Sequence, residues 1–288
     1  MNPSLGSVPA AEIDLRLDRA TALRGRVWES ERPRGLVAIV HGLGEHSGRY
    51  AALASDLVGA RFTVVALDLP GHGESLGTRG DIPSWTQVRD AFIPAMFSTI
   101  AGLPTQPPDL PRVLLGHSMG GLLALDYALH HSKTILGVVA SGPALKNAMP
   151  PAWKMALANV AKVTMPSAGF PHGLPDNAMS RVPEVLSLRK SDPLMHDKIS
   201  PRLYAAMTEA QQRVMREARR LAVPALVMHG AADTVTDPKG SLEFNAAAPH
   251  GMARLLTYGN AYHEIFNDPA RTEAVRDLKG WLDAIVVV

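Results

Sequence analysis

The sequence feature that most constrains the fold is a short apolar run that ends at a serine flanked by glycines. Residues 113–115 lead into Gly116-His117-Ser118-Met119-Gly120, so a glycine stands two residues before and two residues after Ser118. This spacing is typical of the nucleophile elbow, a sharp turn from strand to helix where only glycine fits beside the neighbouring backbone. It predicts a serine hydroxyl presented at such a turn. The alternative is a glycine- and serine-rich structural turn without chemistry.

A serine hydroxyl is a weak nucleophile unless a neighbouring base takes its proton, and that base needs an acid to orient it. Two later strand-like runs supply such groups: residues 224–230 are followed by Asp233, and residues 253–258 are followed by His263. Parallel strands bring their carboxyl ends to one edge of a sheet, where open α/β folds place their active sites. The sequence therefore predicts Ser118 as nucleophile, Asp233 as acid and His263 as base.

Other acids and histidines fit structural roles better. Asp237 precedes a proline and a helical run, which is typical of a helix N-cap followed by proline at the first helical position. Glu264 is expected to point away from the neighbouring histidine. The chain has eleven histidines. We expect the His117 side chain to point away from the nucleophile, and of the candidates only His263 follows a strand after the acid.

Acyl transfer also requires two backbone N–H groups that bind the negative oxygen of the tetrahedral intermediate. One is expected from Met119, the residue after the nucleophile. The other is expected from the glycine-rich segment 41–44 after the strand-like run 35–40, which makes Leu43 the second oxyanion donor. A further glycine-rich loop, residues 68–75, lacks the spacing of either phosphate-binding motif, so we expect a structural turn near the site.

Five segments together resemble a known family. They are His41-Gly42-Leu43-Gly44-Glu45-His46-Ser47-Gly48-Arg49-Tyr50, the Asp68-x-x-Gly71-His72-Gly73-Glu74-Ser75 loop, Gly116-His117-Ser118-Met119-Gly120-Gly121, Ala232-Asp233 and Tyr262-His263-Glu264. These motifs resemble those of monoacylglycerol lipases and related lysophospholipases of the α/β-hydrolase superfamily. The resemblance implies the same triad and the same two oxyanion donors. It also implies that Glu45 and Arg49 lie near a site for a polar head group, although an ion pair that braces the loop explains both residues equally well.

The order of predicted elements agrees with one domain of this class. The 288 residues give an opening hairpin in 11–29 and then apolar runs at about 36–40, 63–67, 113–115, 135–140, 225–229 and 254–258. Strands that alternate with helices predict a mostly parallel sheet covered on both faces. We expect the α/β-hydrolase fold with a cap inserted after the sixth strand. Residues 1–143 and 202–288 would form the core, and the proline-rich residues 144–201 the cap or lid.

The resemblance implies hydrolysis of lipid esters through an acyl-enzyme, with monoacylglycerol cleaved to fatty acid and glycerol. The alternatives are a general carboxylesterase, a lysophospholipase of other specificity, a serine peptidase of the proline-iminopeptidase kind and a non-catalytic binding protein. A haloalkane dehalogenase or epoxide hydrolase would need an aspartate where Ser118 stands. The mechanism requires no metal and no organic cofactor.

Charge and hydropathy bear on partners and location. The formal net charge of +2 gives no argument for nucleic acid, and the chain has no cysteine for disulfides or thiolate metal sites. Residues 1–9 lack the basic and apolar regions of a secretory signal, and no apolar run approaches the roughly 20 residues of a membrane span. We expect a soluble, cytoplasmic protein that acts on a small lipid ester and touches a membrane or micelle surface transiently through the cap.

Residues 153–164 predict an amphipathic helix in the cap, with apolar side chains at helical spacing from Trp153 onward. That apolar face either packs on the core or lines a tunnel for an acyl chain together with nearby methionines, which suit a flexible lipid pocket. In the second case Trp153 is a substrate-binding residue.

Trp153→Asp tests the tunnel. A carboxylate in an acyl tunnel opposes long apolar chains most, so hydrolysis of long-chain esters is expected to fall more than hydrolysis of short-chain esters. The measurement is kcat/KM across a chain-length series, and equal losses on all chain lengths would refute a role in chain selection.

Overall fold

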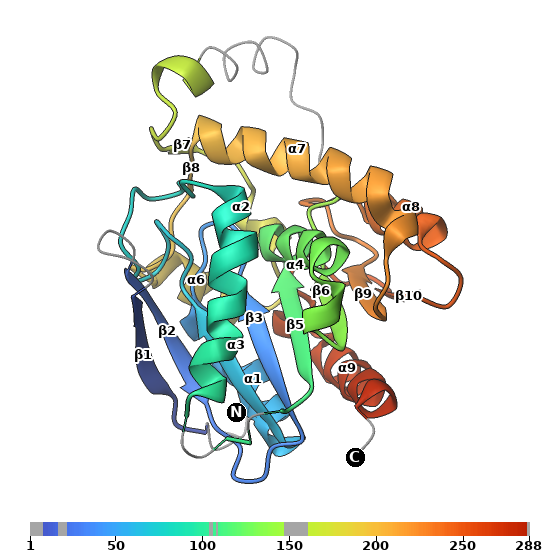
Figure 1. Cartoon of the computed structure of the whole chain (residues 1–288). Helices are drawn as coiled ribbons and strands as arrows, with labels where there is room; N and C mark the ends of the chain where they lie inside the picture. The colour runs from blue at the N-terminus through green and yellow to red at the C-terminus, as the bar shows by residue number, and fades with distance from the viewer. Residues whose placement is uncertain (1–7, 17–21, 104–105, 108, 147–160, 287–288) are drawn as a thin grey trace.

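The computed structural model describes residues 8–16, 22–103, 106–107, 109–146 and 161–286. Within them, eight strands form the central sheet (Figure 1). Their order across the sheet is β1-β2-β4-β3-β5-β6-β9-β10. The strands are β1 (Ala11–Arg16), β2 (Ala22–Trp28), β3 (Gly35–Val40), β4 (Phe62–Leu67), β5 (Arg112–His117), β6 (Gly137–Ser141), β9 (Ala225–Gly230) and β10 (Ala253–Tyr258). The first two neighbouring pairs are antiparallel and all later pairs are parallel. The predicted hairpin and mostly parallel sheet are therefore confirmed.

The apolar runs of the sequence match the observed strands to within about two residues. The largest shift at a strand start is in β6, which begins at Gly137 rather than at residue 135. The preceding residues form the 3₁₀ turn η3 (Ser132–Thr134), and the ladder with β5 starts where Val113 lies opposite Gly137. Apolar character therefore marks the buried segment, while the hydrogen-bond ladder decides where the strand begins.

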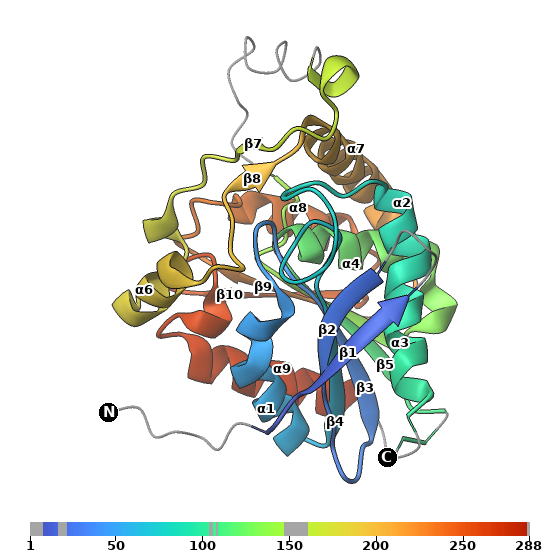
Figure 2. The same cartoon turned by 90° about the vertical axis from the view of Figure 1, so that its left-hand side faces the viewer.

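The sheet separates two apolar cores. In β3, Leu36, Ala38 and Val40 belong to one core and Val37 and Ile39 to the other, because successive side chains of a strand point to opposite faces. The helices cover both faces (Figure 2). The first core is covered by α3 (Ile93–Ala101), α4 (Met119–His130), α7 (Pro201–Glu217) and α8 (Pro238–Ala247), and the second by α1 (Ala51–Gly59) and α9 (Arg271–Ile285).

In the described part of the chain between β6 and β9, the segments β7 (Phe170–Pro171), β8 (Lys198–Ile199) and α7 lie at the top of Figure 1, above the upper ends of the strands. The same part also holds η4 (Asp176–Ala178), α6 (Pro183–Ser191) and η5 (Ala218–Arg220). This is the expected insertion after the sixth strand; the exact domain bounds of 144 and 201 stay a prediction. Trp153 and most of the predicted amphipathic helix lie outside the described residues. Its last residues, 161–164, are helical, and Val163 there is 81% exposed.

A buried carboxylate ties this covering layer to the helix that follows Ser118. Asp126 of α4 is fully buried and accepts hydrogen bonds from Arg213 of α7 at 2.9 and 2.8 Å and from the Trp85 indole at 2.9 Å. Trp85 begins α2 (Trp85–Gln87), which continues into the π-helical turn η2 (Val88–Phe92). Three elements therefore meet at one side chain of the helix that follows Ser118.

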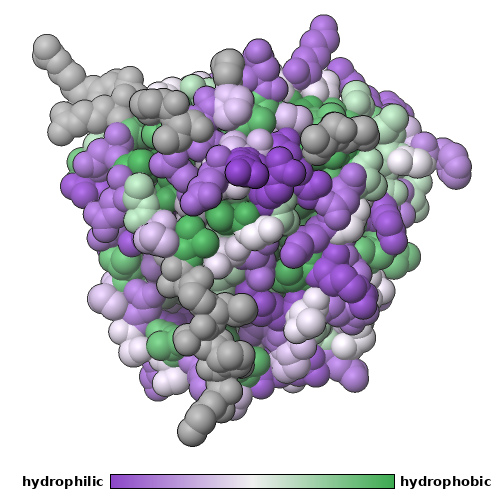
Figure 3. Space-filling view, turned by 90° about the horizontal axis from the view of Figure 1, so that it is seen from below, coloured by the Kyte–Doolittle hydropathy of each residue, from purple (hydrophilic) through white to green (hydrophobic). Residues whose placement is uncertain are grey.

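The opposite end of the molecule carries hydrophilic side chains spread across the face, with hydrophobic ones scattered between them (Figure 3). Within the described residues, no helix is both long and apolar enough to cross a membrane.

Gly116→Ala and Gly280→Ala form a matched pair that tests the turn at Ser118. A Cβ at Gly116 would collide with the carbonyl oxygen of Gly120, whereas a Cβ at Gly280, inside α9, meets no described atom within 4 Å. We expect Gly116→Ala to lower the free energy of unfolding by about 3 kcal/mol or more, and Gly280→Ala to raise it by about 0.5–1 kcal/mol. Urea unfolding measures both, and a neutral Gly116→Ala would contradict the collision.

Candidate active site

Ser118 sits at the turn between β5 and α4, as predicted. Its φ of 55° and ψ of −118° are strained for a residue with a side chain. The neighbouring glycines make this turn possible: a Cβ at Gly116 would strike the Gly120 carbonyl, and a Cβ at Gly120 would strike the Val40 carbonyl of β3. The turn is held by the Ser118 N–H, which donates to the Ser141 carbonyl at 2.9 Å. The elbow is therefore a tight crossing of β3, β5 and α4.

Asp233 and His263 follow β9 and β10 and meet at the same edge of the sheet. His263 Nδ1 lies 2.7 Å from Asp233 Oδ2, and Oδ1 accepts the backbone N–H groups of Val235 and Thr236 at 2.7 and 3.0 Å. Burial opposes ionisation of Asp233, but hydrogen bonds from His229 and His263 outweigh it and hold the Asp233 pKa below its usual range. Because this carboxylate is ionised, it accepts the hydrogen on His263 Nδ1, which leaves Nε2 free to act as a base.

Backbone contacts bring His263 to the elbow. A Cβ at Gly142 would lie 3.2 Å from His263 Nδ1, and Gly142 directly follows Ser141, whose carbonyl binds the Ser118 N–H. The ring of His117, the residue before the nucleophile, lies 4.7 Å from the His263 ring between centroids. The predicted acid and base are thus in direct contact, and Gly142 and His117 place the His263 ring beside the turn that carries Ser118.

The segment expected to supply an oxyanion donor lies against the nucleophile. A Cβ at Gly42 would stand 3.2 Å from the Ser118 Cβ. The Gly42 N–H already donates to Glu45 Oε2 at 3.1 Å. The next N–H, that of Leu43, therefore remains the candidate oxyanion donor of this segment. Met119 is the first residue of α4, and the N–H at that position has no carbonyl partner within its own helix.

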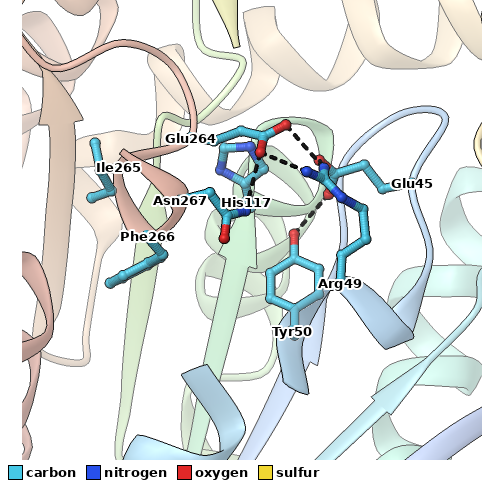
Figure 4. A pocket seen from close by; sticks show the side chains of 8 residues that line it. All are labelled: Glu45, Arg49, Tyr50, His117, Glu264, Ile265, Phe266 and Asn267. Carbon is cyan, nitrogen blue, oxygen red and sulfur yellow. Dashed lines mark hydrogen bonds and ion pairs between the residues drawn. The ribbon is translucent and has the colours of Figure 1, made fainter. Parts of the chain in front are cut away.

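Glu45 and Arg49 form the ion pair that the sequence left as one of two alternatives. Arg49 Nη1 lies 2.6 Å from Glu45 Oε1, and the guanidinium also binds Glu264 at 2.9 and 2.7 Å (Figure 4). Tyr50 donates its hydroxyl to Glu45 at 2.8 Å. Glu264 points into this cluster, away from the Asp233–His263 contact, as predicted.

A residue of α6 completes the cluster. Arg189 is 8% exposed, and its Nη1 lies 3.2 Å from Glu264 Oε1 and 3.8 Å from Glu45 Oε1. Two arginines thus balance two buried carboxylates. Burial opposes ionisation of Glu45 and Glu264, but the arginines hold the pKa of each carboxyl below its usual range. We call these four residues, Glu45, Arg49, Arg189 and Glu264, the ion cluster.

A small cavity of about 10 Å³ lies between the ion cluster, His117 and the turn η6 (Ile265–Asn267). That is about the space of a single water molecule. His117 is buried here, and its Nδ1 lies 3.1 Å from the Ser141 carbonyl. Burial, followed by the charge of His263, lowers the His117 pKa to about 4. His117 is therefore neutral at pH 7.

Several structural assignments made from the sequence are confirmed. Asp237 caps α8 and accepts the Lys239 N–H at 2.9 Å. The loop 68–75 is a packed turn in which the buried Asp68 carboxylate binds the backbone N–H groups of Ser47 and Glu74 at 2.6 and 2.8 Å.

Sequence reasoning did not anticipate three contacts near the predicted triad: the packing of the His117 ring on His263, the binding of Arg189 to Glu264, and the binding of His229 to Asp233. His229 stands four residues before the acid at the end of β9, and that spacing is the one signal that points to it. Arg189 gives no local signal for the ion cluster, because Glu264 lies 75 residues and Glu45 even further away in sequence, and only the folded chain brings them together.

The fold and these residues define a class of protein. A sheet of this order, with a serine at the turn from β5 to α4 and a histidine–aspartate pair at the same edge, is that of a serine hydrolase with the α/β-hydrolase fold.

Comparisons with known proteins agree. Residues 31–270 match the model of the family described as serine aminopeptidase, S33. The chain is 35% identical over 263 residues to a monoacylglycerol lipase of Mycolicibacterium smegmatis, covering 89% of this chain and 91% of that protein. It is 30% identical to the monoglyceride lipase of Homo sapiens, covering 89% and 85%, and 31% identical to the phospholipase YtpA of Bacillus subtilis, covering 90% and 99%.

A solved structure gives the same result. The crystal structure of the Paleococcus ferrophilus monoacylglycerol lipase matches with a TM-score of 0.83 at 36% identity, over 91% of this chain and 98% of that one. The chain belongs to the monoacylglycerol lipase family of the α/β-hydrolase superfamily, and it is a serine ester hydrolase.

The depressed His117 pKa predicts a stability that depends on pH. The unfolded chain binds a proton at this histidine near pH 6.5, the folded protein only near pH 4. Between these values the unfolded state holds more protons, so the free energy of unfolding falls as the pH falls. His117→Gln should remove about 3 kcal/mol of the decline from pH 7 to pH 4, measured by urea unfolding across this range. Parallel curves for the variant and the natural protein would contradict the burial of a neutral ring.

Proposed function

We propose that Ser118, His263 and Asp233 form the catalytic triad of an enzyme that hydrolyses lipid esters. The observation that carries this proposal is the 2.7 Å contact between His263 Nδ1 and Asp233 Oδ2 beside a serine held at φ 55°. This geometry leaves His263 Nε2 as the base toward the elbow and keeps the carboxylate on its far side.

The reaction proceeds in two steps. His263 Nε2 takes the Ser118 proton while the oxygen attacks the ester carbonyl, and the resulting imidazolium gives this proton to the departing alcohol. Water then attacks the acyl-enzyme with His263 again as base, and the fatty acid is released. Asp233 remains ionised throughout, because its lowered pKa keeps it from accepting the proton.

The Leu43 and Met119 N–H groups bind the oxyanion in both steps. Support comes from the approach of Gly42 to Ser118 and from the position of Met119 at the start of α4. The positive end of the α4 dipole adds to this stabilisation. Each donor of this kind typically contributes about 10²–10³ in rate.

Monoacylglycerol is the proposed substrate, with fatty acid and glycerol as products. The relatives that carry this name span most of the chain. The family description names an aminopeptidase and one relative is a phospholipase, so peptides and lysophospholipids are the substrates to compare.

In this proposal, Glu45 and Arg49 stabilise the oxyanion loop, residues 41–44, and do not bind a head group. Glu45 Oε2 binds the Gly42 N–H and the Tyr50 hydroxyl, and Oε1 binds Arg49. The adjoining cavity of about 10 Å³ is too small for glycerol. A head-group role would require the ion cluster to open.

The covering layer is the proposed contact with a membrane or micelle. Val163, Met165 and Phe170 are exposed at 81, 54 and 42% within eight residues of chain, and apolar side chains clustered in this way favour a lipid surface. The cytoplasmic location stays a prediction.

Ser118→Ala tests the nucleophile. We expect hydrolysis of monooleoylglycerol to fall at least 10³-fold with an unchanged melting temperature, because the hydroxyl alone is removed. The measurement is fatty-acid release, run beside p-nitrophenyl esters from two to sixteen carbons. Ser98→Ala, at an exposed serine of α3, is the matched control and should keep full activity.

Other outcomes discriminate between the alternatives. Activity confined to short esters would make the protein a general carboxylesterase, and turnover of lysophospholipids alone would make it a lysophospholipase. Cleavage of amino-terminal peptides would favour the peptidase. Absence of labelling by a fluorophosphonate probe would favour a non-catalytic binding protein.

A further inference from the structure

His229 is a second histidine that contacts Asp233, beside His263. It is fully buried near the end of β9, and its Nε2 is 3.1 Å from Asp233 Oδ2, the same oxygen that His263 Nδ1 contacts at 2.7 Å. Its other ring nitrogen, Nδ1, is 2.7 Å from the hydroxyl of Ser241 in α8. One carboxylate oxygen is thus shared by two histidines.

The surroundings of His229 determine where its hydrogen lies. Nε2 faces two acceptors, the ionised Asp233 oxygen and the Thr236 carbonyl, each at 3.1 Å. Two acceptors around one ring nitrogen require a hydrogen on that nitrogen. In the neutral ring Nδ1 is then an acceptor, and the Ser241 hydroxyl donates to it. Ser241 therefore selects the tautomer that donates to Asp233.

Besides the two histidines, the Thr236 hydroxyl is the side-chain donor next to Asp233 Oδ2 among the described residues. The Thr236 hydroxyl lies 2.9 Å from Asp233 Oδ2 and 3.1 Å from the Gly142 carbonyl, and it has one hydrogen for the two. When the Thr236 hydroxyl donates to the Gly142 carbonyl, the His229 N–H is the remaining side-chain donor that keeps Oδ2 oriented toward His263. The two backbone N–H groups on Oδ1 set the plane of the carboxylate from the opposite side.

We propose that His229 is a positioning residue for the triad, which acts through Asp233. Its Nε2–H fixes the rotamer in which Oδ2 faces His263 and draws negative charge away from the Asp233–His263 contact. The contacts Ser241–His229, His229–Asp233 and Asp233–His263 then run from α8 to the histidine of the proposed triad. This inference rests on the proposed triad and adds to it a group outside the substrate site.

His229→Met and His229→Gln form a matched pair that tests it. The two side chains have nearly the same length, and glutamine keeps an N–H donor where methionine has none. We expect His229→Met to lose about tenfold in kcat with KM within twofold, and His229→Gln to stay within about threefold of the natural enzyme. Monooleoylglycerol is the substrate, and melting temperatures and fluorophosphonate labelling measure the folded, active fraction.

The pH profile separates positioning from packing. Without its His229 donor, Asp233 holds a proton on His263 more strongly, so the acid side of the kcat/KM profile should move toward neutral pH in His229→Met and not in His229→Gln. A purely structural role would lower the amount of active enzyme and leave the profile in place.

Ser241→Ala supplies a second, milder variant. It removes the hydroxyl that selects the ring tautomer, so kcat should fall about threefold relative to the natural enzyme. Added to His229→Met, the same change should have no further effect on kcat, because no ring remains. Wild-type kcat and pH profile in both His229→Met and Ser241→Ala would overturn the inference. Ser118→Ala, run in parallel, reports on the triad itself: if it stays inactive, only the role of His229 fails.

Discussion

The close crossing of backbones at Ser118 determines where every other active-site group must lie. Hydrogen atoms in place of side chains at Gly116 and Gly120 let β5, α4 and β3 approach one another closely. Ser118 is therefore lifted out of the sheet, and the N-terminus of α4 points at the space beside it. The Gly42 segment after β3 and His263 after β10 approach that space from other strand ends at the same edge, so the parallel sheet acts as a common scaffold for three segments far apart in sequence.

The ion cluster couples those segments to the chain that covers them. Glu45 accepts the Gly42 N–H in the loop after β3, Glu264 directly follows His263, and Arg189 joins both glutamates from α6. The four charges balance, and each buried carboxylate needs its arginines because an unpaired charge inside a protein is strongly unfavourable. Through Arg189, α6 is thereby tied both to the loop that contains Glu45 and to the segment that contains Glu264.

Much of the fold was predictable because its determinants are local. Apolar runs identified the strands to within about two residues, glycine spacing identified the elbow, and Asp237 before proline identified a helix start. The start of β6 was placed two residues early, since hydropathy does not report ladder register. The choice between head-group contact and ion pair for Glu45 and Arg49 was not decidable locally, because their further partners Glu264 and Arg189 lie more than 130 residues away in sequence.

The amino-acid sequence alone determined the serine turn that only flanking glycines permit, and it predicted an acid and a histidine after strands in the order this fold uses. Those features are read from spacing, which the covalent chain carries with it. Only the tertiary structure decided which groups share an environment. The pairing of His229 with Asp233, the packing of His117 on His263 and the closure of the ion cluster by Arg189 depend on distances through space, and burial gives those contacts their strength by excluding water.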